Sequence, residues 1–306
     1  MENYKIVQEC VDEYIEMAQV ESPDDYLFTK NLANIILRND RPLPIKYYSK
    51  TSFYDSFKYA YKFLGNLNID YQERLEKYVK DDTIIFEENS GNVSYSTLND
   101  DNEREIYISI EENIGDAFSV VHELMHDINI DMSQTSISRD LLTEALSLLS
   151  EMLLEDYLVK NNVKDAKVPN NLNFYYAYLK AIEVAFNLKL IEHTLNDGYI
   201  NPSIYKELVD YYDASYIVDK IVDDHGLTLD FEQRYIIAAP IACYMYNRIK
   251  KDKKNLNELF ELNELIITKD FDDLLNYLDL EVEEDDLSIS SYQKLENSYK
   301  KYIKSR

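Results

Sequence analysis

The sequence contains no tryptophan, and its 306 residues include only five glycines, six prolines and two cysteines. So few glycines and prolines exclude a fold of many short strands joined by tight turns, and they favour long helices. The cysteines, Cys10 and Cys243, lie far apart in the sequence and form no CxxC pair. This spacing excludes a disulfide framework and is typical of a protein from a reducing compartment.

The sequence also lacks a candidate membrane span and a secretion signal. Its longest apolar run, "YIIAAPIACYMY" at 235–246, is too short to cross a bilayer and contains Pro240. The N-terminal stretch "MENYKIVQECVDEY" is polar and acidic, unlike a signal peptide. We therefore predict a cytoplasmic protein with no membrane partner.

Positive charge is scarce. The chain has 32 Lys and Arg against 58 Asp and Glu, which gives a net charge of −26. Such a charge repels phosphate backbones, so nucleic acid is not an expected partner. The charge favours solubility, and it would also draw basic peptides toward an acidic cleft. The sequence does not indicate an oligomeric state.

Apolar residues recur at helical spacing through most of the chain, so the fold class is mostly α. A break at "RNDRPLP" separates a short N-terminal helical cap, residues 1–40, from a main domain at 41–306. The spacing becomes strand-like at 83–88 and 104–110, with a short strand around 93–96, and we expect a small antiparallel sheet there. The cap holds two helices, and the other predicted helices cover 52–65, 70–79, 114–130, 138–160, 171–195, 202–212, 215–224, 228–249, 255–263, 270–278 and 288–304.

Two of the four histidines lie four residues apart in "FSVVHELMHDINI" at 118–130. On a helix, His122 and His126 share one face, where both rings can reach one zinc ion. Glu123 can accept a proton from a zinc-bound water and pass it to a leaving amine. The alternative is a helix with two incidental histidines, but histidine is rare in this chain, so the pattern seldom arises by chance. We predict one zinc ion per chain.

A catalytic zinc needs a third protein ligand and an open position for water. The next helix, "RDLLTEALSLLSEMLLEDYLVK", offers Glu144, Glu151 and Glu155. Glu144 is flanked by small and apolar residues, as expected for an inward-facing carboxylate, and we predict it as the ligand. Glu151 lies two turns along the same face, where it would hold a histidine ring by its other nitrogen or else face solvent.

These two helices resemble the active-site helices of the oligoendopeptidase F and thimet oligopeptidase family of zinc metallopeptidases. The family's motif is H-E-x-G-H, followed by a helix whose glutamate ligand precedes a small residue, with serine three and glutamate seven positions later. Glu144, Ala145, Ser147 and Glu151 match that spacing. The resemblance covers about residues 50–305 and leaves out the long N-terminal lobe of full-length members.

The resemblance implies a mostly helical zincin of the gluzincin type, an endopeptidase whose deep channel admits short peptides. The strand at 104–110 would be the edge that pairs with an extended substrate. Tyr244 and Tyr246 would take the place of the family's tyrosines, which hydrogen-bond the scissile carbonyl as it becomes an oxyanion. For each tyrosine, the alternative is a core residue on a helix.

The chain departs from the family pattern at three points. Met125 replaces the glycine of the motif, the 18 residues from His126 to Glu144 make a shorter loop than usual, and no histidine precedes Tyr244 at the family's position. The predicted zinc ligands are unaffected. The departures motivate two alternative functions: a zinc-binding protein that binds peptides for regulation with weakened turnover, and a dedicated protease of one protein partner.

Overall fold

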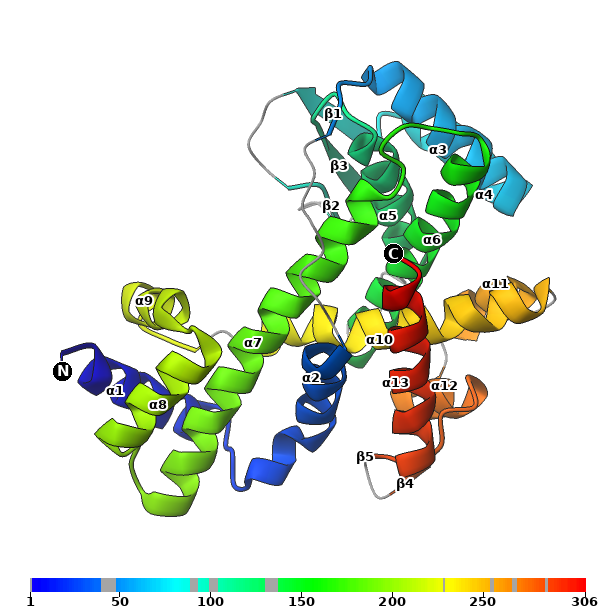
Figure 1. Ribbon diagram of the computed structural model, residues 1–306. Helices are drawn as coiled ribbons and strands as arrows, with labels where there is room; N and C mark the ends of the chain where they lie inside the picture. Colours follow the sequence, from blue (N-terminus) through cyan, green and yellow to red (C-terminus); the bar gives the residue numbers. More distant parts are fainter. Residues whose placement is uncertain are drawn as a thin grey trace.

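The computed structural model describes residues 2–39, 48–88, 93–98, 104–129, 137–227, 229–253, 256–265, 269–283 and 286–306. Helices dominate these residues, as predicted, and none of them combines the length and apolarity needed to cross a bilayer. Figure 1 shows α1 (Glu2–Met17), η1 (Pro23–Tyr26), α2 (Leu27–Asn39), α3 (Phe53–Leu67), α4 (Ile69–Lys80), β1 (Ile84–Glu88), β2 (Tyr95–Leu98), β3 (Arg104–Ile110), α5 (Gly115–Asn129), α6 (Ile137–Lys160), α7 (Val168–Asp197), α8 (Pro202–Tyr212), α9 (Ser215–Asp224), α10 (Leu229–Lys251), α11 (Leu256–Leu265), α12 (Phe271–Tyr277), β4 (Val282–Glu283), β5 (Asp286–Leu287) and α13 (Ile289–Lys304).

Local sequence explains where several helices begin and end. Ser52 caps α3 by accepting a hydrogen bond from the Asp55 N–H, as N-cap serines commonly do. α7 begins before the predicted residue 171 because Pro169, which lacks an N–H, fits the first turn of a helix. Gly198 ends α7 with a φ of 76°, a left-handed conformation that glycine adopts without steric cost.

The three-stranded sheet is mixed, with the order β1-β3-β2. β1 pairs with β3 in parallel, whereas β2 pairs with β3 antiparallel. The prediction of a purely antiparallel sheet was therefore wrong for β1. Side-chain alternation determines which face of a strand is buried and carries no information about its direction. Residues 89–103 make the connection between β1 and β3 long enough for a parallel pair, and β2 lies within it.

β3 is the central strand, so the prediction that it is a substrate-pairing edge was also wrong. β2 pairs with Arg104 to Tyr107 on one side, and β1 pairs with Ile106 to Ile110 on the other. Residues 106–110 are all buried. A continuous run of buried residues is typical of a strand covered on both faces.

Two hydrophobic cores lie on either side of α6. The smaller core joins the sheet to α3, α4 and α5, and it includes the fully buried Leu124 and Met125. The larger core joins α1, α2, α6, α7, α10 and α13. α6 contributes Leu149 to the larger core and Leu158 to the smaller one. This helix therefore determines how the two cores meet.

The N-terminal helices pack against the larger core. α2 buries Leu32 and Ile36 there and packs against α7, α10 and α13. Figure 1 shows α1 close to α8 and α9, at the far end of the long helix α7. The division into a cap at 1–40 and a domain at 41–306 stays a prediction.

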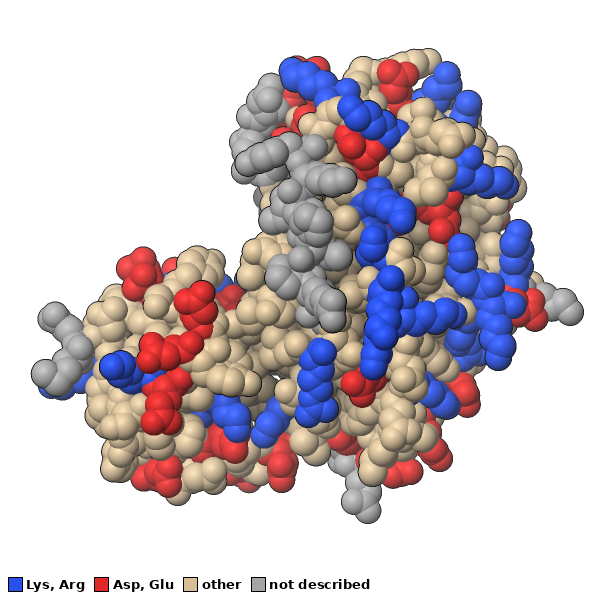
Figure 2. Space-filling view, viewed as in Figure 1, with Lys and Arg blue, Asp and Glu red and all other residues tan. Residues whose placement is uncertain are grey.

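Charge is unevenly spread over the face shown in Figure 2. Acidic side chains gather around α8 and α9, whereas Lys and Arg side chains gather around the C-terminal end of α13. A local basic region therefore exists on a strongly acidic protein.

Candidate metal centre

Helix α5 carries both histidines of the predicted motif. Its first turn is fixed by Asn113, whose Oδ1 accepts a hydrogen bond from the Gly115 N–H at 2.7 Å. The spacing of four residues places His122 and His126 one turn apart on the same face. Their Nε2 atoms are 2.9 Å apart. Both rings therefore present a nitrogen to the same point.

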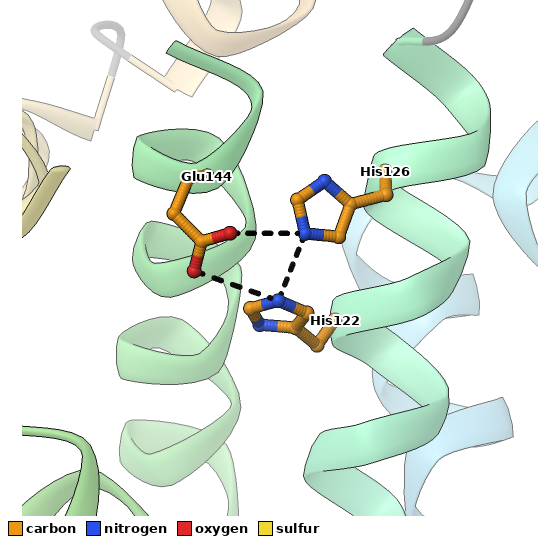
Figure 3. A group of neighbouring side chains, drawn as sticks. All are labelled: His122, His126 and Glu144. Atoms are coloured by element: carbon orange, nitrogen blue, oxygen red, sulfur yellow. Dashed lines mark hydrogen bonds and ion pairs between the residues drawn. The ribbon is translucent and has the colours of Figure 1, made fainter. Parts of the chain in front are cut away.

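Glu144 reaches that point from α6, as Figure 3 shows. Its Oε2 is 3.2 Å from His126 Nε2, and its Oε1 is 3.7 Å from His122 Nε2. The ligand atoms of all three residues lie within 4.8 Å of one another, which makes them a possible metal-binding group. Glu144 Oε1 is buried and has no hydrogen-bond partner among the described residues. A buried polar atom without a partner is costly, and a bound cation would remove that cost.

The electrostatics of the group also favour a cation. Burial opposes the charged form of His122, but Glu144, Glu151 and Glu123 together raise its pKa to about 10. Burial likewise opposes ionised Glu144, yet His122, His126 and Arg234 lower its pKa to about 2. The carboxylates around the two histidines therefore favour positive charge at this point.

Glu151 holds His122 from the side opposite to Glu144. Its Oε1 is 2.5 Å from His122 Nδ1, and its other oxygen accepts a hydrogen bond from Asn173 on α7. Ser147 Oγ donates to the His122 carbonyl at 3.2 Å. A carboxylate that accepts the Nδ1 proton leaves the Nε2 lone pair available for a metal.

Asp127 anchors the other face of α5. This carboxylate is 1% exposed and accepts a hydrogen bond from the Tyr78 hydroxyl at 2.7 Å. Its Oδ1 is 2.9 Å from Arg104, at the start of β3. The helix is thereby attached to α4 and to the sheet at the residue after His126. Sequence reasoning did not identify Asp127, because its partners come from distant segments.

A cavity of about 400 Å³ opens beside these residues, and His122, Glu123, Glu144 and Glu151 line it. Glu123 is only 7% exposed, and its burial raises its pKa. Met125, at the position where the sequence resemblance leads us to expect glycine, is fully buried in the smaller core and does not line the cavity. Further lining residues that sequence reasoning did not single out as site residues include Tyr48, Glu111, Asp116, Asn173 and Tyr235.

The predicted tyrosines, Tyr244 and Tyr246, do not line this cavity. Tyr244 is 8% exposed and contacts Arg248, and the Tyr246 hydroxyl donates to Asp156 at 2.9 Å. Tyr235, on the same helix, does line the cavity, and the positions of the other two tyrosines relative to it explain why they do not. Tyr244 lies nine residues later, on the opposite face, and Tyr246 lies eleven residues later, about 16 Å along the helix.

Solved structures match the fold of the chain, although no family model and no curated protein matches its sequence. A chain from Chlamydophila abortus, described as a peptidase, aligns with a TM-score of 0.59 at 14% identity. PZ peptidase A with an inhibitor aligns with a TM-score of 0.60 at 10% identity. A chain from Bacillus anthracis strain Ames, described as an oligoendopeptidase F, aligns with a TM-score of 0.55 at 10% identity.

Each alignment covers 97% of this chain but only 55% to 58% of the other one. The chain thus spans little more than half the length of these proteins. At such low identity, the likeness concerns the fold alone. The mostly helical chain with its small sheet has the fold of these peptidases.

Proposed function

We propose that this chain is a zinc-dependent endopeptidase that hydrolyses peptide bonds in short peptides. The observation that carries the proposal is the convergence of His122, His126 and Glu144 beside a cavity that His122 and Glu144 line. The peptidase fold, matched over 97% of the chain, supports it.

The three side chains fit a catalytic zinc site. Two imidazoles and one carboxylate are a common ligand set for catalytic zinc, and they leave a position for water. Glu144 Oε1, which has no hydrogen-bond partner among the described residues, and the two histidine nitrogens 2.9 Å apart are donor atoms that one zinc ion could share. Zinc held there would polarise a water molecule and favour its ionised form.

Glu123 is the proposed proton acceptor. It is buried, it lines the cavity, and its burial raises its pKa above that of an ordinary glutamate. A raised pKa lets a carboxylate accept a proton from the attacking water and return it to the leaving amine. Glu151, held between His122 and Asn173, would keep the His122 ring oriented.

Tyr235 and Tyr48 are better placed than Tyr244 and Tyr246 to donate to the developing oxyanion, because both line the cavity. The Tyr235 ring packs edge-on against Tyr176 with centroids 5.1 Å apart. Burial, together with Glu151 and Asp116, raises the pKa of Tyr48 well above its usual range. The Tyr48 hydroxyl therefore keeps its proton and can act as a donor.

The cavity favours basic substrates. Its lining includes the carboxylates of Glu111, Asp116, Glu123, Glu144 and Glu151, and the structure describes no Lys or Arg among the lining residues. Even if a bound zinc ion added two positive charges, these five carboxylates would outnumber the positive charges in the lining. A cationic peptide side chain would be attracted to this lining and to the acidic protein as a whole.

The direct test combines metal analysis with peptide cleavage. Protein reconstituted with zinc should hold about one ion per chain, and Glu144→Ala should lose it. A mixed peptide library, read by mass spectrometry, should be cleaved by wild type but not by Glu123→Gln, which keeps the metal. Glu112→Gln is the matched control, because Glu112 is exposed, pairs with Lys50 and does not line the cavity. Equal cleavage by wild type and Glu123→Gln would exclude Glu123 as the base.

The same library distinguishes the alternative functions. A wild-type protein that holds zinc and retains peptides without cutting them would instead be a peptide-binding, regulatory protein. Cleavage of one folded protein, with no cleavage in the library, would identify a dedicated protease. The burial of Met125 away from the cavity favours active hydrolysis, because this departure from the family motif adds no side chain to the cavity lining.

A further inference from the structure

A second cavity lies where the C-terminal half of α6 meets the ends of α10 and α13. Its volume is about 360 Å³, and it shares no lining residue with the cavity at the metal centre. Tyr246, which the sequence suggested as a catalytic group, lines this second cavity. So do six charged side chains: Glu155, Asp156, Lys167, Lys250, Lys301 and Arg306.

Arg306 builds one wall of the second cavity. Its side chain is 2% exposed, and all its N–H groups have protein acceptors. The guanidinium pairs with Glu155, and it donates to Asn171 Oδ1 and to the Lys167 carbonyl, each at 2.7 Å. Arg306 is therefore a structural clamp, and it neutralises Glu155.

Asp156 is neutralised in a similar way. Lys250 Nζ lies 2.9 Å from its Oδ2, and the Tyr246 hydroxyl donates to the same carboxylate. The Tyr246 and Tyr302 rings meet edge-on, with centroids 5.3 Å apart. Both acids of the cavity thus have a cation of their own, and the walls are partly aromatic.

Two cations remain, because the structure gives neither Lys167 nor Lys301 an ion-pair partner among the residues it describes. Four of the six charged side chains in this lining are cationic, although acidic residues outnumber basic ones by 58 to 32 in the chain. Figure 2 shows the surrounding region of Lys and Arg side chains at the C-terminal end of α13. The side chains of the cavity therefore carry two surplus positive charges.

We propose that the second cavity binds a small phosphate-bearing anion, either inorganic phosphate or a phosphate monoester. A phosphate monoester carries about −1.5 to −2 charges near pH 7, which matches the two surplus lysines. The volume falls within the range of small-molecule sites, roughly 300–1,000 Å³. Acidic side chains that lie farther than about 8 Å from the cavity repel an anion in it only weakly, because physiological salt screens charges beyond that distance.

Phosphate fits this lining better than a single carboxylate does. One carboxylate would leave one lysine unpaired, whereas a phosphate group offers at least three acceptor oxygens for two ammonium groups and their neighbours. Lys167 and Lys301 come from separate elements, before α7 and within α13. They can therefore approach one group from two directions without altering the clamp around Arg306.

The test measures binding of two probes, inorganic phosphate and phenyl phosphate, by isothermal titration calorimetry on the full chain. Metal is first removed with a chelator, so that neither probe can bind at the metal centre and the result does not depend on peptidase activity. Lys167→Glu and Lys301→Glu are the test variants, and both side chains are exposed enough for the fold to tolerate the change. Lys206→Glu is the control, because it changes the net charge equally on exposed α8, which Figure 1 places far from the C-terminus.

We expect saturable binding of one molecule per chain, weakened at least tenfold in each test variant and unchanged in Lys206→Glu. Tighter binding of phenyl phosphate would identify a monoester as the ligand class, and tighter binding of inorganic phosphate would identify the free ion. The proposal is overturned by the absence of saturable binding of either probe, by unchanged affinity in both test variants, or by an equal loss in Lys206→Glu.

Discussion

Replacing Glu151 by Gln should weaken zinc binding without unfolding the protein. In the wild type, one Glu151 oxygen is 2.5 Å from His122 Nδ1 and the other accepts from Asn173. This arrangement assigns the proton of neutral His122 to Nδ1 and leaves the Nε2 lone pair available to bind a metal. A glutamine of the same shape has one acceptor and one donor, so it cannot satisfy both neighbours in the same way.

Each orientation of the new amide has a cost. If its oxygen stays with Asn173, its NH₂ faces His122 Nδ1, which moves the ring proton to Nε2 and blocks the metal. If its oxygen faces His122, its NH₂ meets the Asn173 NH₂, and two donors oppose each other. Replacing a carboxylate that orients a metal ligand typically weakens metal binding about 10- to 100-fold, or about 1.4–2.7 kcal/mol.

Competition with a chromophoric zinc chelator measures this change directly, and thermal unfolding of the metal-free proteins checks that the fold is kept. The control is Glu183→Gln, because Glu183 is also a buried glutamate, held between Lys180 and Lys220 away from the histidines. The reasoning would be refuted by a folded Glu151→Gln protein whose zinc affinity is within twofold of wild type, or by an equal loss in Glu183→Gln.

Three further predictions follow from other residues of the site. Tyr235→Phe should lower kcat for peptides by roughly 10²-fold, the effect of losing one oxyanion donor, and Tyr246→Phe should lower it far less; steady-state kinetics with one peptide decides between them. Asp127→Ala should reduce the free energy of unfolding by about 2 kcal/mol in urea titrations, because it removes charge-assisted bonds to Arg104. Burial raises the pKa of Asp116 to about 6 from an ordinary 3.8, so its contribution to stability is full below pH 4 and is lost as pH rises through 6. Asp116→Asn should remove this loss of stability at rising pH. Urea midpoints of the wild type and the variant, measured from pH 4 to 7.5, test this. A difference between the two proteins that stays constant with pH would show that Asp116 is not responsible.

The candidate metal-binding group could be predicted from sequence because two of its three members lie close together on one helix. His122 and His126 are one helical turn apart, and the apolar neighbours of Glu144 marked it as buried. The structure brings these three residues together within 4.8 Å. Helix periodicity is a strong signal over long segments, so most helices were also placed within a few residues.

The remainder of the site depends on packing between distant segments. Asn173 reaches Glu151 only because α7 packs against α6, and Tyr48 reaches the cavity from a segment 74 residues before His122. Sequence alone could not show which tyrosine of α10 lines the cavity at the metal centre. Tyr235 and Tyr246 lie on the same face of the helix, and only their distance from the cavity along the helix axis distinguishes them. Strand direction in the sheet was likewise set by long-range pairing.

Helix α6 is common to both cavities, and Asn170 joins their residues. Its Nδ2 donates to the backbone carbonyl of Glu151 at 3.2 Å and to Glu155 Oε2 at 2.8 Å, so it bridges the backbone of the residue that holds His122 and the carboxylate clamped by Arg306. Any ligand that shifts this bridge acts at both ends of it. Thermodynamic linkage then makes the effect mutual: the factor by which phosphate changes the affinity for zinc is the factor by which zinc changes the affinity for phosphate. Two titrations, each repeated with the other ligand present, would measure the same coupling free energy.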